Sequence, residues 1–253
     1  MALYCLSDVH GDLAAFDAAL ALILFTDPKT TCYILGDLID CGEHSYGCLQ
    51  RAFELAKRSN QVTVQLGNHE AMFLDFLFGE DTLDWLTQDV QFKTTLSFFS
   101  PDQWQALLQA MQANVQQSRQ LVRQALLAHH RRLLTWLQSR PLVTELDAQI
   151  LVHAGIDEAA GPWWRMGTPD EVLTGKYPAT TGRFAKIIIA GHVSAAEVAG
   201  DRGFEGHLYC DGKSHFYIDG TTLRSHVVPV LRVRGKRYEE LCEDGVRVLL
   251  EQD

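Results

Sequence analysis

The sequence predicts an α/β fold (α+β in some classification schemes), with parallel strands that carry helices on their faces. One observation is that short apolar runs alternate with segments of helical periodicity over residues 3–66. The other is that polar groups directly follow apolar runs in five blocks along the chain. Because the ends of parallel strands meet at one edge of a sheet, we expect these groups to lie together. They are Asp8-Val9-His10, Gly36-Asp37-Leu38-Ile39-Asp40, Gly67-Asn68-His69-Glu70, His153-Ala154-Gly155 and Gly191-His192.

The first part of the chain predicts three strands and two helices. Residues 3–6, 32–35 and 62–66 are apolar runs of strand length that end at polar motifs. Apolar residues recur at helical spacing over 13–24, and a second helix is expected at 45–58. This order of strand, loop and helix predicts a parallel arrangement.

The alternation stops at residues 71–140, which are rich in Gln, Leu, Ala and Trp and poor in strand signals. Pro101 predicts a helix start with Ser100 as its N-cap, and residues 104–137 favour one long helix or two shorter ones. We interpret 71–140 as a helical insertion. Two roles stay open for it, a cap over the polar edge of the sheet or an extra packing layer.

Strand signals resume after the insertion, at 142–143, 150–152 and 186–190. Alternating patterns at 208–209, 216–218 and 223–233 predict further strands, which we expect to form a second, more antiparallel sheet. No internal repeat or clear linker divides the sequence. Residues 1–253 are therefore interpreted as one domain with a helical insertion.

Composition excludes several classes of protein. The 253 residues are 47% hydrophobic and 21% charged, as in ordinary globular proteins. The net charge of -10 argues against a long nucleic-acid partner, which needs clustered Lys and Arg. No apolar run reaches membrane-spanning length, and six cysteines without a C-x-x-C pair suggest free thiols. With no export signal at the start, we expect a cytoplasmic protein; its oligomeric state stays open.

The polar motifs have the ligand types of a two-metal centre. Asp8 and His10 are two residues apart, so they can face the same way and bind one ion. Asp37 can bridge two ions, while Asn68 and the imidazoles of His153 and His192 can bind the second. Such mixed nitrogen and oxygen ligands suit manganese, iron or zinc. Hydrolysis of a phosphate ester is the leading chemistry for two bridged divalent metals.

Other residues near these motifs are candidates for proton transfer and substrate binding. His69 can protonate the leaving oxygen, and Asp40 can fix its tautomer and keep it charged. Arg165 is the candidate phosphate clamp; the alternative is a surface arginine beside Trp163 and Trp164. We also assign substrate contact to Asn68, Cys41 and His44. His44 is in the same loop as Cys41, and the alternative is that it has no role in the site.

All five motifs in order resemble the phosphoprotein phosphatase family of the calcineurin-like metallophosphoesterases. The similarity extends over residues 3–219 and is greatest to a bacterial and bacteriophage branch that includes symmetrical diadenosine tetraphosphate hydrolases. The resemblance implies a β-sandwich of two mixed sheets flanked by helices. It also implies the ligand sets given above, the His69–Asp40 acid pair, a phosphate-binding Arg165 and a match of Asp219 to an aspartate at a late strand end.

One motif departs from this family. The second block usually continues Asp-Arg-Gly, with the arginine on substrate phosphate, whereas this chain has Asp40-Cys41-Gly42. A charge-assisted phosphate contact contributes about 1.5–3 kcal/mol. Our hypothesis is that the loss shifts the preference toward monoanionic diesters, or that the cation comes from elsewhere.

The sequence thus predicts a dinuclear phosphatase in which metal-bound hydroxide hydrolyses phosphate monoesters. The expected cofactors are two divalent ions, with Mn²⁺ first and Fe, Zn, Co, Ni or Mg as alternatives. A phosphorylated protein is the leading substrate class, and small phosphoesters share the same site. The alternatives are a dinucleoside polyphosphate or phosphodiester hydrolase and, in another class, a non-catalytic scaffold. We expect no membrane partner.

Overall fold

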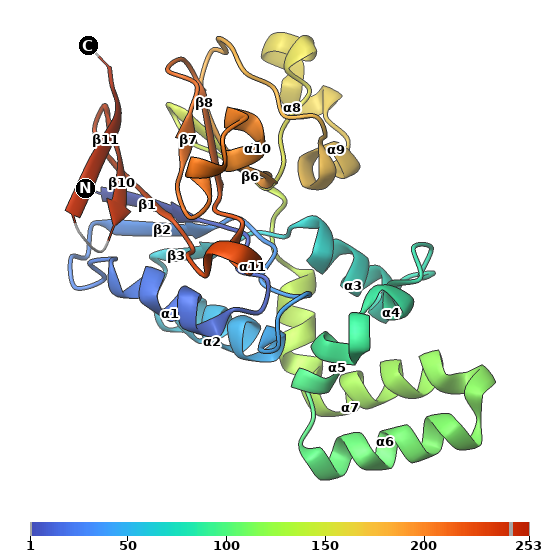
Figure 1. Ribbon diagram of the computed structural model, residues 1–253. Coiled ribbons are helices and arrows are strands. Elements are labelled where there is room, and N and C mark those ends of the chain that lie inside the picture. Colours follow the sequence, from blue (N-terminus) through green and yellow to red (C-terminus); the bar gives the residue numbers. More distant parts are fainter. Residues whose placement is uncertain (1, 243–244, 253) are drawn as a thin grey trace.

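The structure is a computed structural model that describes residues 2–242 and 245–252, and it contains two mixed β-sheets (Figure 1). The first sheet has the strand order β11-β10-β9-β1-β2-β3 and the second β4-β5-β6-β8-β7. The first comprises β1 (Ala2–Leu6), β2 (Thr30–Ile34), β3 (Val62–Val64), β9 (Val230–Arg234), β10 (Arg237–Cys242) and β11 (Gly245–Glu251). The second comprises β4 (Val143–Glu145), β5 (Gln149–Val152), β6 (Ile187–Ser194), β7 (Tyr209–Cys210) and β8 (His215–Asp219).

The second sheet has a parallel centre with an antiparallel strand at each edge, whereas the first has three parallel strands on one side and three antiparallel strands on the other. Strands β1, β2 and β3 run parallel, as do β5, β6 and β8. The late strands do not form a sheet of their own, so that prediction was wrong. Strands β7 and β8 join the second sheet, whereas β9 pairs antiparallel with β1 and leads β10 and β11 into the first. Alternation reveals a strand but not its partner.

The two sheets pack against each other through a shared apolar layer. Cys5 and Leu35 from the first sheet region meet Leu151, Ile189 and Phe216 from the second. The Phe216 and Tyr238 rings stack at 4.9 Å between centroids, which joins β8 to β10. This layer fixes the two sheets relative to each other, and so fixes the loops at their ends.

Helices cover the outer faces of both sheets. Helices α1 (Leu13–Ala21) and α2 (Ser45–Arg58) lie against the first sheet, and α1 ends three residues before the predicted 13–24. Trp164 and Leu173 pack on the outer face of the second sheet. The short helices between β5 and β9 are η3 (Glu158–Trp163), α8 (Trp164–Gly167), α9 (Asp170–Gly175), α10 (Ala195–Ala199), η4 (Arg202–Phe204) and α11 (Thr222–Ser225). Helix α11 occupies part of the predicted strand 223–233.

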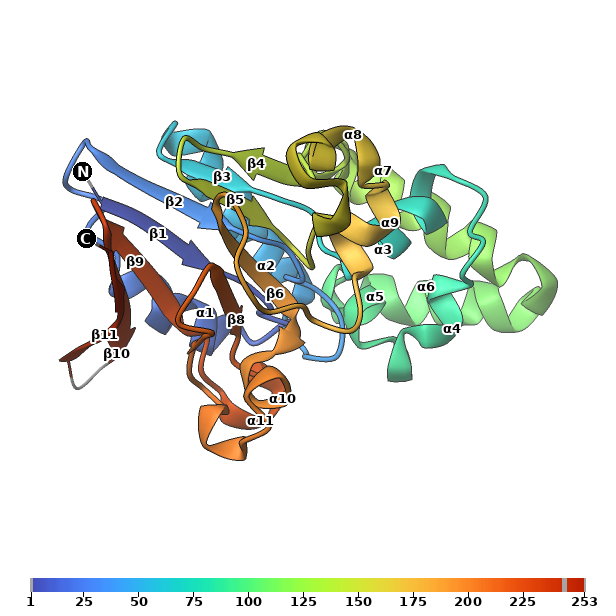
Figure 2. The ribbon, with the colours of Figure 1, turned by 90° about the horizontal axis from the view of Figure 1, so that it is seen from above.

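The segment after β3 is helical, as predicted. Helix α6 (Pro101–Ala113) and the first part of α7 (Ser118–Gln138) lie side by side and project away from the sheets, while the end of α7 returns to pack against α2 (Figures 1 and 2). Ser100 caps α6: its hydroxyl accepts from the backbone of Gln103, whose side chain accepts from the Ser100 backbone. The segment comprises α3 (Asn68–Phe78), α4 (Trp85–Gln88), η1 (Val90–Phe92), α5 (Lys93–Ser97), α6 (Pro101–Ala113), η2 (Val115–Gln117) and α7 (Ser118–Gln138).

The helical segment shares one hydrophobic cluster with the first sheet and its helices. Phe53 of α2 meets Trp136 of α7 with ring centroids 5.1 Å apart, and Phe73 of α3 meets Trp85 of α4 at 4.6 Å. Such aromatic pairs stabilise the fold by more than the burial of their apolar surface alone. The single-domain organisation and the cap role of 71–140 stay predictions.

Within the described residues, every helix is too short or too polar to cross a lipid bilayer.

Candidate active site

The loops after β1, β2, β3 and β5, together with an irregular stretch of β6 that contains His192, bring the predicted ligands to one edge of the sheets. The backbone carbonyl of Gly36 accepts from the Asp8 amide, and that of Asp37 accepts from the His10 amide, so the loops after β1 and β2 are joined. Several residues here have left-handed backbone, which is uncommon for residues other than glycine and concentrates at functional sites. They are Asp8, His10, Asp37, Asp40, Cys41 and His192.

Two glycines let the backbone approach the carboxylates closely. A Cβ atom on Gly67 would lie 2.0 Å from Oδ1 of Asp37, and one on Gly191 would lie 2.1 Å from Oδ2 of Asp8. Neither position has room for a side chain unless a carboxylate moves. The amide that follows each glycine motif then binds the acid: the His192 amide donates to both Asp8 oxygens, and the His69 amide donates to Oδ1 of Asp37.

Glu70 holds the loop after β2 in place. This fully buried carboxylate accepts from the backbone amides of Asp37, Leu38 and Gly67 at 2.7–2.9 Å. Burial, and then the negative charge of Asp37, raises the pKa of Glu70. Glu70 therefore caps the first turn of α3 through the Gly67 amide and also holds the backbone of the predicted ligand Asp37.

His10 and Asp37 form the first group of candidate ligand atoms. Nδ1 of His10 donates to the Ile39 carbonyl at 3.3 Å, which leaves Nε2 with a lone pair. That nitrogen lies 3.9 Å from Oδ1 of Asp8 and 3.9 Å from Oδ2 of Asp37. Ligand atoms of His10, Asp37 and His69 lie within 4.8 Å of one another, so they can share an ion.

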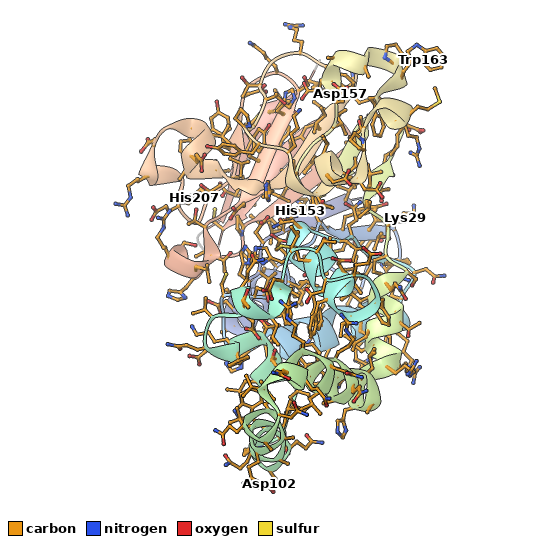
Figure 3. All side chains as sticks on the ribbon, turned by 90° about the vertical axis from the view of Figure 1, so that its right-hand side faces the viewer. Lys29, Asp102, His153, Asp157, Trp163 and His207 are labelled. Atoms are coloured by element: carbon orange, nitrogen blue, oxygen red, sulfur yellow. The ribbon has the colours of Figure 1, made fainter. Side chains whose placement is uncertain are left out.

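His153, His192 and Asn68 form the second group around Asp37. Nδ1 of His153 donates to the Leu35 carbonyl at 2.9 Å, so Nε2 faces Oδ2 of Asp37 at 3.3 Å. Oδ1 of Asn68 lies 3.0 Å from Nε2 of His153 and 3.0 Å from Nδ1 of His192. Asp37 thus belongs to both groups, as a bridging ligand must. Figure 3 places His153 near the centre of the molecule.

The close approach of these groups shifts their pKa values in opposite directions. Burial lowers the pKa of His153, but the Asp37 carboxylate outweighs burial and raises it to about 10. Burial, and then the charge on His153, lowers the pKa of His192 to about 4. Burial raises the pKa of Asp8 to about 6. Imidazole and carboxyl groups bind a cation only in their deprotonated forms. The nitrogen and oxygen donors gathered around Asp37 fit divalent metals.

His69 and Asp40 form the predicted acid pair. Nδ1 of His69 lies 2.8 Å from Oδ2 of Asp40, and Nε2 lies 3.9 Å from Oδ2 of Asp37. Burial opposes the charged ring, yet Asp37 and Asp40 raise the pKa of His69 to about 9. The imidazole is thus oriented from behind, and its other nitrogen points into the metal-ligand groups.

The helical segment holds Asp40 in place through two residues that the sequence did not indicate. Nε1 of Trp85 donates to Oδ2 of Asp40 at 3.1 Å, and the Thr94 hydroxyl donates to Oδ1 at 2.7 Å. Ser45 accepts from the Asp40 amide at 3.1 Å and lies 3.2 Å from the Thr94 hydroxyl. Trp85 and Thr94 are buried. Tryptophan and threonine are ordinary core residues, so no local signal linked them to Asp40.

The remaining candidates lie around the groups or away from them. Cys41 is exposed on the turn after Asp40, and burial of its thiol, followed by the charge on Asp40, raises its pKa. His44 is exposed and begins α2 without a side-chain cap bond. Arg165 pairs with Glu145 at 3.3 Å and is 61% exposed. Burial, and then the charge on Asp8, raises the pKa of Asp219 to about 8. The roles of all these residues stay predictions.

Comparisons with known proteins agree with this geometry. A symmetrical bis(5'-nucleosyl)-tetraphosphatase of Acidovorax ebreus is 40% identical over 79 residues, which is 31% of this chain and 27% of that protein. One from Neisseria meningitidis serogroup A is 25% identical over 214 residues, which is 82% of this chain and 61% of the relative. The chain therefore spans less than two thirds of the length of these relatives.

The same fold is found among solved structures. The cold-active protein-tyrosine phosphatase of a psychrophilic Shewanella superimposes with a TM-score of 0.60 at 15% identity, over 98% of this chain and 80% of that one. At this identity the likeness concerns the fold alone. The profile described as calcineurin-like phosphoesterase matches residues 1–195, well over half of the sequence. With the ligand groups at the expected strand ends, we conclude that this chain belongs to the calcineurin-like phosphoesterase family.

Proposed function

We propose that this chain hydrolyses dinucleoside polyphosphates with the help of two divalent metal ions. Membership of the phosphoesterase family supports the reaction class. The relatives that match it are named symmetrical tetraphosphatases, which favours the dinucleoside polyphosphate alternative over the phosphoprotein phosphatase expected first. The observation that carries the proposal is the pair formed by His69 and Asp40 beside ligand groups that share Asp37.

The metal ions are held by six side chains. Asp8, His10 and Asp37 are the proposed ligands of one ion, and Asp37 with Asn68, His153 and His192 those of the other. When bound, two such ions neutralise phosphate charge and provide an activated water for in-line attack on phosphorus. Carbonyls behind His10 and His153 fix which ring nitrogen is the ligand.

His69 supplies the proton for the leaving group. Because Asp40 binds Nδ1, a proton on Nε2 faces the ligand groups, where the leaving oxygen departs. For a dinucleoside tetraphosphate cut at its centre, that oxygen belongs to a nucleoside diphosphate. The products of each turnover would then be two diphosphates.

A substrate panel tests the proposal. Protein stripped with chelator and reconstituted with Mn²⁺ is given diadenosine tetraphosphate, phosphopeptides, p-nitrophenyl phosphate and its bis-aryl diester. We expect the highest kcat/KM with the tetraphosphate and ADP as its product. ATP plus AMP would contradict central cleavage, and faster turnover of phosphopeptides would restore the phosphoprotein phosphatase. Metal-free, inert protein would support the non-catalytic scaffold.

A further inference from the structure

Lys93, the first residue of α5, carries its ammonium group to the turn that follows the acid pair. Nζ donates to the Cys41 carbonyl at 3.2 Å, and Cys41 directly follows Asp40. The next residue of α5, Thr94, binds Asp40 through its hydroxyl. One short segment of the helical insertion therefore both holds the carboxylate behind His69 and places a cation beside it.

The segment that carries Lys93 is firmly fixed. The buried Asp89 carboxylate accepts from the amides of Thr94 and Thr95 at 2.9 and 2.8 Å. Ser97, at the end of the same helix, accepts from the Tyr46 amide of α2 at 3.0 Å. The base of the Lys93 side chain is thus held relative to the loop, and only its flexible stem has freedom.

In the part of the chain that the structure describes, Lys93 is not paired with a carboxylate, unlike Lys176 and Arg165. Within the described residues, Nζ of Lys93 has no carboxylate oxygen within 4.0 Å, whereas Lys176 pairs with Glu158 at 2.8 Å and Arg165 pairs with Glu145 at 3.3 Å. A lysine bound only to a carbonyl keeps two donors for an anion. In a chain of net charge -10, such a cation beside the acid pair favours an anionic ligand.

We propose that Lys93 binds a phosphate group of the substrate other than the one under attack, on the side of the leaving group. This inference rests on the proposed function and extends it, because it assigns the site to substrates with several linked phosphates. The ligand groups around Asp37 engage the attacked phosphoryl group, and His69 marks the side from which the leaving oxygen departs. A diphosphate leaving group would bring its second phosphate toward the Cys41 turn, which the Lys93 ammonium group contacts.

The test compares anions with one phosphate and with three. Inhibition constants of inorganic phosphate and tripolyphosphate are measured against p-nitrophenyl phosphate with Mn²⁺-reconstituted protein. The variants are Lys93→Met, which removes the charge, and Lys93→Arg, which keeps it. Lys29→Met is the matched control, because Lys29 is an exposed lysine before β2, at the end of that strand away from Asp37. Circular dichroism and thermal melting verify folding.

We expect Lys93→Met to raise the ratio of the tripolyphosphate constant to the phosphate constant about tenfold, the low end for a charge-assisted contact at a partly exposed site. Lys93→Arg should stay within about threefold of wild type, and Lys29→Met should not change the ratio. An unchanged ratio in Lys93→Met, or an equal change in both constants, would overturn the assignment.

Failure of the proposed function would look different. If no phosphoester were hydrolysed, tripolyphosphate binding to the Mn²⁺-loaded protein would be measured by calorimetry with the same variants. A Lys93-dependent affinity would then support the phosphate contact without the hydrolase. A Lys93-independent affinity in an active enzyme would instead reject the contact and leave the hydrolase standing.

Discussion

Two groups of buried histidine and carboxylate side chains differ in how their charges are balanced. The metal-ligand cluster comprises Asp8, His10, Asp37, Asn68, His153 and His192. The His215 cluster comprises His215, Glu158, Asp211 and Lys176. In the second, both ring nitrogens of His215 meet a carboxylate, at 3.1 Å (Glu158) and 3.2 Å (Asp211), and Lys176 binds Glu158. Every charge has a permanent partner from the protein.

The metal-ligand cluster lacks such partners. Within the described residues, neither Asp8 nor Asp37 has a lysine or arginine within 4.0 Å; the basic groups at that distance are imidazoles, which can bind a metal. Backbone carbonyls hold His10 and His153 from behind, so the second nitrogens of these two rings turn toward Asp37. The comparison teaches that residue types alone do not single out a candidate metal site. The candidate here is the cluster whose carboxylates lack a fixed lysine or arginine partner among the described residues.

Exchange of one carboxylate in each cluster should give the largest contrast. Asp37→Asn removes the shared ligand, so we expect a loss of bound metal and a fall in kcat/KM on the order of 10⁴-fold, since each ion contributes several kcal/mol. Glu158→Gln should leave kcat/KM within about threefold. Plasma emission spectroscopy and tetraphosphate hydrolysis measure both effects. Equal losses in the two variants would break the comparison.

Substitution of His69 distinguishes a metal ligand from a proton donor. Its ring lies close enough to His10 and Asp37 to share an ion with them, but its Nδ1 is bound to Asp40. We expect His69→Asn to keep both metals and to lose about 10²–10⁴-fold in rate with poor leaving groups, and far less with p-nitrophenol. The exposed His129→Asn serves as control. A loss of one metal from His69→Asn would make His69 a ligand, and a full rate would remove it from the mechanism.

The donors to Asp40 should have smaller effects. Trp85→Phe and Thr94→Val each remove one hydrogen bond from this carboxylate, and we expect about a tenfold loss in kcat/KM, as for other groups that orient a functional side chain. Trp104→Phe and the exposed Thr87→Val are matched controls within the insertion. If the losses were the same for good and poor leaving groups, the two donors would not act through His69.

Cys41→Arg tests the departure from the family pattern. An added cation on the exposed turn should raise turnover of monoesters relative to diesters several-fold, because a monoester carries more negative charge. The ratio of p-nitrophenyl phosphate to bis-p-nitrophenyl phosphate hydrolysis measures it, with Cys41→Ser as control. An unchanged ratio would count against our charge-based hypothesis.

The His215 cluster should affect stability through pH. Burial opposes the charge on Glu158, but His215 and Lys176 lower its pKa to about 2, so its contribution is complete above about pH 4.3 and declines as pH falls toward 2. Burial lowers the pKa of His215, yet Glu158 and then Asp211 raise it overall. Its contribution is complete below about pH 6.5 and is lost as pH rises through the raised pKa.

The difference in Tm between wild type and Glu158→Gln, with metals chelated, should therefore be greatest between about pH 4.3 and 6.5. It should decline on both sides, and a part should persist at pH 8 because Lys176 also binds Glu158, at 2.8 Å. The exposed Glu80→Gln is the control. A difference that did not vary with pH would mean that His215 and Glu158 are not coupled.

Much of the site was predictable because four of the ligand motifs lie in loops that follow strands and the fifth, at His192, lies near the end of β6. Parallel strands bring their ends together, so Asp8, Asp37, Asn68, His153 and His192 could be grouped from their positions in the sequence. The sequence also predicted that Asp40 pairs with the His69 imidazole. The sequence failed for the late strands predicted at 208–209, 216–218 and 223–233, because an alternating pattern is the same whichever sheet the strand joins. It did not indicate β10 and β11.

The sequence by itself determined the alternation of strands and helices, the ligand types and their order, since these depend on local periodicity and on residue chemistry. Only the tertiary structure decided that Trp85, Thr94 and Lys93 meet the turn at Asp40 and Cys41, and that Arg165 faces Glu145. Those contacts join residues 20 to 54 positions apart. Their partners follow from how helices pack in three dimensions, which no local pattern records.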